Sequence, residues 1–164
     1  VVSEYPPLLQ SDGKLLVYSG IKGFYSSQPS FQLTRLLNTG TLDVSYGVSG
    51  KKNIVLNSVP PYYAEPFLQS DDKLILKSAP DSYHSTLITR YNNNGTLDSL
   101  FGVLGSITVP NILTTRLSQQ TDGKIVVVGA DYSIGLAYPF SIFRINSLLD
   151  TTLKSAAAFL SSVF

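Results

Sequence analysis

The feature that most constrains how this chain can fold is an internal repeat. A first block, in which Gln-Ser or Gln-Thr precedes Asp, a turn residue, Lys and an aliphatic run, begins at three positions: Gln10, Gln69 and Gln120. A second block, in which an arginine precedes a polar turn and an aspartate, recurs in the same order, with its arginines at Arg35, Arg90 and Arg144. Two blocks in phase at a period of roughly 55 residues indicate one supersecondary unit used three times. We therefore predict a single repeat domain over 1–164, with units at 1–60, 61–110 and 111–164.

Each unit predicts strands joined by turns. Asp12-Gly13 and Asp122-Gly123 each precede a lysine and an apolar run, which is typical of a tight hairpin turn because glycine accepts positive φ. Asp72 replaces that glycine in the second unit, and aspartate tolerates the same conformation at some cost. The aliphatic runs are too short for helices and rich in branched residues, so we predict central strands buried on both faces, at 15–18, 74–76 and 125–128.

In the first copy these signals predict four strands, at about 5–9, 14–18, 31–37 and 51–58. Short strands repeated at this period without an intervening helix favour propeller blades over a sandwich. The fold class that we predict is all-β, with three propeller-like four-stranded antiparallel blades that form a partial β-propeller, which oligomerisation could close. The third copy departs from the pattern after Arg144, because Leu153-Lys154 stands in place of an aromatic residue and a glycine.

The repeated blocks also resemble those of a known family. The sequences QSDGKLLV at 10–17, LTRLLNTGTLDVSYG at 33–47 and ITRYNNNGTLDSLFG at 88–102 are similar to the delta-60 repeat, a family of tandem bacterial repeats. The resemblance covers nearly the whole chain. It implies a propeller-like repeat architecture in secreted, surface or large multidomain proteins, and it implies no catalysis.

Charge and composition narrow the classes of partner. The chain has 12 Lys and Arg against 11 Asp and Glu, and no basic run is longer than Lys51-Lys52, so we expect no nucleic-acid partner. No apolar segment approaches the roughly 20 residues that cross a bilayer, so we expect no membrane insertion. The absence of cysteine excludes disulfides, thiol catalysis and cysteine-ligated metal.

The chain also has few residues from which a catalytic site could be built. His84 is its only histidine, and Glu4 and Glu65 are its only glutamates, so a metal site or a hydrolytic triad lacks parts. Ser11 and Lys14 fit a Ser-x-x-Lys signature, but that signature needs a helix, whereas these positions recur in predicted turns. We expect no enzymatic activity, no cofactor and no metal. A site built from sparse carboxylates on a propeller is the remaining enzymatic alternative.

The repeated arginines lie on predicted strands among alternating apolar residues, and a repeated aspartate follows each of them. An arginine on an inward face needs a partner that compensates its charge. We therefore predict three structural ion pairs: Arg35 with Asp43, Arg90 with Asp98, and Arg144 with Asp150. A ligand-binding role for three arginines around a channel is the alternative.

The loop between the second and third strand of each unit is long, variable and carries tyrosine. A propeller would place these loops on one rim, and tyrosine is favoured at protein contacts and sugar-binding faces because it combines apolar area with a hydroxyl group. The candidate residues for binding a partner or ligand are Tyr25, Tyr83, His84, Tyr132 and Tyr138. The alternative is that these rings pack on the adjacent blade.

Two classes of function remain. The first is a non-enzymatic structural or adhesive repeat module of a cell-surface, secreted or virion assembly, which acts through protein–protein or surface contacts. The alternative is a carbohydrate-binding β-propeller. Since three units would leave blade faces unpaired, the expected partners are other copies of the chain in a homo-oligomer or other assembly subunits, with glycans under the alternative. We expect an extracellular, cell-surface or virion location.

Overall fold

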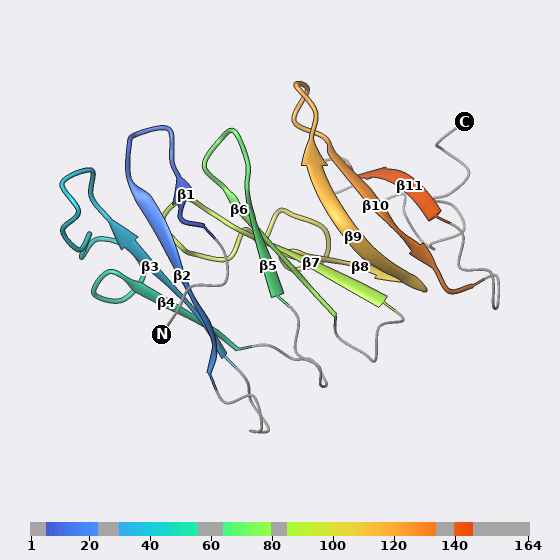
Figure 1. Cartoon of the computed structure of the whole chain (residues 1–164), viewed down its shortest axis with the longest axis horizontal. Helices are drawn as coiled ribbons and strands as arrows, with labels where there is room; N and C mark the ends of the chain where they lie inside the picture. The colour runs from blue at the N-terminus through green and yellow to red at the C-terminus, as the bar shows by residue number, and fades with distance from the viewer. Residues whose placement is uncertain (1–5, 23–29, 56–63, 80–84, 134–139, 146–164) are drawn as a thin grey trace.

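The computed structural model describes residues 6–22, 30–55, 64–79, 85–133 and 140–145. Over these residues the chain forms three antiparallel sheets, which Figure 1 shows side by side in chain order. The first sheet contains β1 (Leu8–Leu9), β2 (Leu15–Lys22), β3 (Ser30–Leu36) and β4 (Lys51–Val55). The second contains β5 (Ala64–Leu68), β6 (Leu74–Ser78), β7 (Ser85–Tyr91) and β8 (Ser106–Pro110). The third contains β9 (Ile112–Gln119), β10 (Ile125–Asp131) and β11 (Phe140–Ile145).

The all-β, propeller-like architecture predicted from the repeat is confirmed, with one difference in the third sheet. Strands that follow one another in the chain lie next to one another in each sheet, as in propeller blades. The third sheet has three described strands where four are predicted. A fourth strand would fall within 146–164, outside the described residues. We refer to the three sheets as blades 1, 2 and 3.

The strand register repeats as closely as the sequence does. The arginine of each unit lies opposite an aliphatic residue of the preceding strand, in the pairs Leu16 with Arg35, Ile75 with Arg90 and Val126 with Arg144. A register slip of one residue would move every side chain to the other face of its sheet. Equivalent positions in the three blades can therefore be compared directly.

The predicted strand bounds of the first unit are close to those observed. Strand β2 runs to Lys22, past the predicted end at 18, and its pairing with β3 contains an irregularity between Ser19 and Lys22. Strand β3 begins one residue earlier than predicted, at Ser30. The first strand is shorter than predicted: it contains only Leu8–Leu9, and Pro6 and Pro7 are described but do not belong to it. The predicted positions 5 and 56–58 lie outside the described residues.

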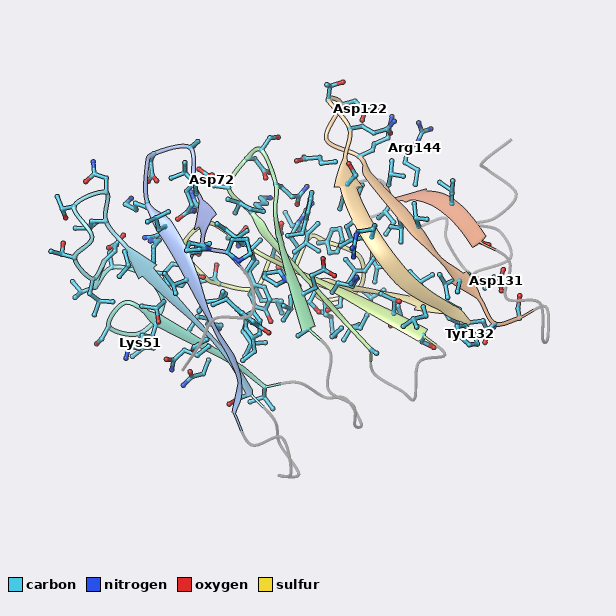
Figure 2. The ribbon with its side chains drawn as sticks, in the orientation of Figure 1. Lys51, Asp72, Asp122, Asp131, Tyr132 and Arg144 are labelled. Atoms are coloured by element: carbon cyan, nitrogen blue, oxygen red, sulfur yellow. The ribbon has the colours of Figure 1, made fainter. Side chains whose placement is uncertain are left out.

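The hairpin turns adopt the predicted left-handed conformation. Gly13 and Gly123 each have a φ of 82°, and Asp72 at the equivalent position has a φ of 61°. In the first turn the Gly13 N–H donates to the Gln10 carbonyl at 3.0 Å, and the Gln10 N–H donates to the Lys14 carbonyl at 2.8 Å. These bonds describe a three-residue hairpin loop that ends in a residue with positive φ. Figure 2 shows Asp72 and Asp122 on these loops.

The prediction that all three central strands are buried on both faces is correct only for β6. All five residues of β6 are buried, whereas buried and half-buried residues alternate at 15–19 in β2 and along β10. The physical reason is that only blade 2 has a neighbouring blade on each side (Figure 1). One face of each outer blade therefore remains without a neighbour from the described residues.

Two apolar clusters join the blades. The first contains Leu16 and Phe31 of blade 1 with Leu74 and Leu76 of blade 2. The second contains Ile75 of blade 2 with residues of blade 3, including Ile125 and Val127. Because successive strand residues point to opposite faces, β6 contributes to both clusters. The core of this fold therefore lies between the blades.

Candidate functional site

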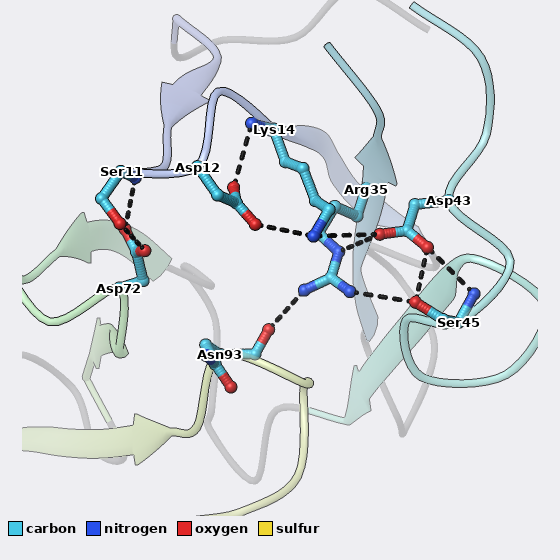
Figure 3. A network of polar contacts seen from close by, with 8 residues as sticks. All are labelled: Ser11, Asp12, Lys14, Arg35, Asp43, Ser45, Asp72 and Asn93. Atoms are coloured by element: carbon cyan, nitrogen blue, oxygen red, sulfur yellow. Dashed lines mark hydrogen bonds and ion pairs between the residues drawn. The ribbon is translucent and has the colours of Figure 1, made fainter. Parts of the chain in front are cut away.

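The repeated arginine and aspartate meet at a corner of the chain between the third and fourth strands of blades 1 and 2. In blade 1 this corner contains Arg35 and Asp43, whose Nε and Oδ2 atoms lie 2.9 Å apart (Figure 3). The Asp43 N–H also donates to the Arg35 carbonyl at 2.9 Å, so the backbone holds the two residues together. Both side chains are buried, with relative exposures of 9% and 7%. We call this arrangement the arginine corner.

Arg35 also joins blade 1 to blade 2. Its Nη1 donates to the backbone carbonyl of Asn93 at 2.6 Å, and its Nη2 donates to the Ser45 hydroxyl at 3.3 Å (Figure 3). The guanidinium carbon lies 4.6 Å from the centroid of the Tyr46 ring, a cation–π distance. The donors of this arginine are therefore directed at protein groups, which favours a structural role over ligand binding at this position.

Blade 2 repeats the corner with different supporting residues. Arg90 Nε lies 2.9 Å from Asp98 Oδ2, and the guanidinium carbon lies 4.4 Å from the centroid of the Phe101 ring. Leu100 stands where blade 1 has Ser45, so the hydroxyl partner is lost. The ammonium group of Lys73 lies 2.9 Å from the same Asp98 oxygen, whereas that of its counterpart Lys14 lies 3.9 Å from Asp43 Oδ2 in blade 1. The ion pair is kept while its surroundings change.

These surroundings keep both aspartates ionised. The hydrogen bond from the Ser45 hydroxyl is the main cause that holds the pKa of Asp43 below its ordinary value. Burial raises the pKa of Asp98, but the hydrogen bond from Lys73 and the charge of Arg90 more than offset it, so this pKa is also lowered. Both carboxylates are therefore charged at neutral pH and match the charge of their arginines.

The third predicted pair cannot be placed in the same way. Arg144 lies on β11 and is exposed, unlike Arg35 and Arg90. Figure 2 labels Arg144 in the third blade. Asp150 lies outside the described residues. The pairing of Arg144 with Asp150 stays a prediction.

The predicted tyrosine rim lies largely outside the described residues, where Tyr25, Tyr83, His84 and Tyr138 fall. Tyr132 is described and half-buried, and its N–H donates to the Asn111 carbonyl at 2.7 Å. Figure 2 shows Tyr132 next to Asp131, at the end of β10. The binding role of these residues therefore stays a prediction.

Exposed aliphatic residues in the corners were missed by the sequence reasoning. Val44 and Val48 in blade 1 are 70% and 81% exposed. In blade 2 the exposed side chains are Leu100 at 71%, Val103 at 79% and Leu104 at 78%. The two corners adjoin, because the Gly47 N–H donates to the Asn94 carbonyl at 3.3 Å. We call these five residues the aliphatic strip; their signal in the sequence was an apolar residue within a glycine-containing turn.

A buried lysine was also missed. Lys77 on β6 is 1% exposed, and its ammonium group lies 2.6 Å from Glu65 Oε2 and donates to the Thr114 carbonyl at 3.1 Å. Burial lowers the pKa of Lys77, although the hydrogen bond and charge of Glu65 act in the opposite direction. Thr114 belongs to blade 3, so this lysine joins two blades. The sequence feature that could have indicated this buried lysine is a charged residue directly after the apolar run of a central strand.

Neither a candidate metal site nor a candidate membrane-spanning helix occurs in the part of the chain that the structure describes. In that part, no group of three or more His, Cys, Asp or Glu side chains is placed so that it could hold a metal ion. Within the same ranges, no helix has the length and apolar character that spanning a membrane requires.

Comparison with known proteins supports the propeller architecture. Residues 10–46 and 120–147 match the model of a family described as "Domain of unknown function (DUF5122) beta-propeller". The first segment contains the first arginine corner, and the second contains the equivalent strands of blade 3. No curated protein matches the chain. In its first and third units the chain is therefore similar to a β-propeller family whose function is unknown.

Proposed function

We propose that this chain is a non-enzymatic structural or adhesive repeat module of a cell-surface, secreted or virion assembly, and that it acts through protein–protein or surface contacts. Its repeats are of the delta-60 type, and its partners are copies of itself or other subunits of the assembly. The aliphatic strip is the contact surface that we assign to this role.

The observation that carries the proposal is the conformation and exposure of Leu104. This residue has a φ of 50°, in the left-handed region that a leucine rarely adopts. Its side chain is 78% exposed. Packing of this side chain against the described residues therefore does not compensate for the unfavourable backbone conformation. The equivalent position in blade 1 is Ser49, which has the same φ of 50° and a polar side chain. A residue that is unfavourable for both stability and solubility supports a role in binding.

The neighbours of Leu104 extend this argument to a surface. Val103 precedes it, and Val48 is its counterpart in the adjoining corner. A group of exposed aliphatic side chains on adjoining corners is typical of a protein or surface contact. The charges of Arg35 and Arg90 are compensated by aspartates, and one exposed charged residue, Lys51, pairs through its backbone with Val48 at the edge of this apolar surface. Such a surface favours adhesion over polar recognition of a small substrate.

The proposal can be tested by adsorption of the full chain to two surfaces, one coated with methyl groups and one with hydroxyl groups. We expect retention on the methyl surface and an at least fivefold lower retention of a Val103→Ser, Leu104→Ser variant. The matched control is Leu9→Ser, since Leu9 is 65% exposed but lies on β1, outside the strip. Equal losses in both variants would show that the strip has no special role.

A glycan array with the same three proteins separates the carbohydrate alternative. Binding of the full chain to a defined glycan, unchanged by the Val103→Ser, Leu104→Ser variant, would contradict the proposal. No glycan binding together with strip-dependent adsorption is the result that the proposal predicts.

A further inference from the structure

Blade 1 presents a face that is covered in both other blades. Leu15 and Val17 on β2 are half-buried. Their counterparts in the other blades pack against the preceding blade and are at most 2% exposed: Leu74, Leu76, Ile125 and Val127. The face of blade 1 that contains Leu15 and Val17 therefore has the pattern of a blade interface, and no described blade precedes it.

The same face of blade 1 includes a turn whose counterpart in blade 2 contacts the arginine corner of the preceding blade. In blade 2 the Asn93 carbonyl accepts from Arg35, the Asn94 carbonyl accepts from the Gly47 N–H, and a Cβ at Gly95 would lie 3.0 Å from the Tyr46 ring. The counterparts in blade 1 are Asn38, Thr39 and Gly40, all of which are exposed. A Cβ at Gly40 would have no described atom within 4 Å. The acceptor turn of blade 1 therefore has open space where blade 2 has an aromatic ring.

Blade 3 presents the complementary face at the other end. Ile142 on β11 is 63% exposed, whereas its counterparts Leu33 and Ile88 are 1% and 0% exposed. Arg144, two residues later, is exposed, whereas its counterparts in blades 1 and 2 are buried. In blades 1 and 2 this face packs against the following blade, and no described blade follows blade 3. One chain therefore carries both halves of a blade interface, at opposite ends.

We infer that these two faces bind each other between copies of the chain: the Ile142 and Arg144 face of one copy docks on the Leu15, Val17 and Asn38–Gly40 face of a second copy. Arg144 reaches the Asn38 carbonyl, as Arg35 reaches that of Asn93 within the chain. The inference rests on the self-association included in the proposed function, and it specifies which faces of two copies bind each other. Two copies joined by two such contacts would place six blades in one ring, within the range of roughly four to eight known for propellers.

The test uses sedimentation of the full chain and two variants that each block one face. Gly40→Asn adds a side chain to the open space; asparagine tolerates the φ of 82° that Gly40 has. Ile142→Asp places a charge on the other face, at a residue that is exposed in the single chain. The matched control is Gly123→Asn, because Gly123 has the same φ of 82° but lies in a hairpin turn of blade 3.

We expect the wild-type chain and Gly123→Asn to form a dimer, and each face variant to raise the dissociation constant at least tenfold. An equimolar mixture of Gly40→Asn and Ile142→Asp retains one intact contact, so it should associate more tightly than either variant alone. A wild-type chain that stays monomeric, or a dimer unaffected by both face variants, would overturn the inference. Because neither face includes the aliphatic strip, adsorption to the methyl surface would persist if only the inference failed.

Discussion

The guanidinium carbon of Arg90 lies 4.4 Å from the centroid of the Phe101 ring, while its Nε pairs with Asp98 at 2.9 Å. Arg90 and Phe101 are 4% and 0% exposed. A buried ion pair is strongly destabilised when one partner is removed, because the remaining charge stays in a poorly solvated site. The arginine corner therefore holds the third strand, the corner loop and the apolar cluster in one arrangement.

We expect Arg90→Ala to lower the free energy of unfolding by about 2 to 4 kcal/mol, since it leaves Asp98 with Lys73 as its remaining cation and removes the contact with Phe101. Urea unfolding at neutral pH measures this change. The control is Lys51→Ala, which removes one exposed charge and should change stability by less than about 0.5 kcal/mol. Similar effects of the two substitutions would contradict the structural role of the corner.

Acid should weaken the same corner. The pKa of Asp98 is below its ordinary value of 3.8, so the stability that its charge contributes is present above pH 3.8 and is lost as the pH falls through the folded-state pKa. Asp98→Asn should therefore be much less stable than the wild type at pH 7, and the difference should narrow below about pH 4. Urea midpoints measured at both pH values test this. A difference that does not depend on pH would mean that the charge of Asp98 is unimportant.

Alkali should act through two buried tyrosines. Burial raises the pKa of Tyr46 and of Tyr91 from 10.0 to about 12. The unfolded chain ionises these groups first, so stability is full below pH 10 and falls between pH 10 and about 12, by about 1.4 kcal/mol per pH unit for each tyrosine. A Tyr46→Phe, Tyr91→Phe variant should show a shallower decline. Phenolate absorbance and urea midpoints measure both effects, and an unchanged slope would refute this assignment.

Leu104→Gly should stabilise the chain although it removes a large side chain. Glycine adopts a φ of 50° without the steric penalty that leucine has, which is about 1 kcal/mol, and Leu104 is mostly exposed. The thermal midpoint should rise by about 2 to 4 °C. Ser49→Gly is the matched control at the same φ and should also stabilise, but it should leave adsorption to the methyl surface unchanged. A lower midpoint for Leu104→Gly would mean that Leu104 packs against the chain.

The sequence allowed the blades and their turns to be predicted because both arise from local patterns. The Asp-Gly signal gave the positive φ of Gly13, and alternating residues around Arg90 placed it on the inward face of a strand. The equal register of the three units follows from the phase of the two repeated blocks. Each of these signals lies within a few residues of the structure that it specifies.

Contacts between blades could not be predicted in this way. Arg35 donates to the carbonyl of Asn93, which is 58 residues away, and a backbone carbonyl has no sequence signature. Lys77 has Tyr18 and Val128 as its counterparts, so the repeat gives no reason to expect a buried ammonium group there. Its partners become visible only when blades 2 and 3 are packed together. The exposure of Leu104 likewise depends on the orientation of the corner loop in the folded chain, which the local sequence does not indicate.

The most direct measurement of the central claim, that the outer blades have open faces which a second copy covers, is amide hydrogen exchange at two protein concentrations. In dilute solution, amides of β6 should exchange more slowly than those of β2 and β10, because only β6 is buried on both faces. At high concentration, protection of β2 and β10 should rise towards that of β6. Equal protection of the three strands in dilute solution, with no change on concentration, would contradict the account.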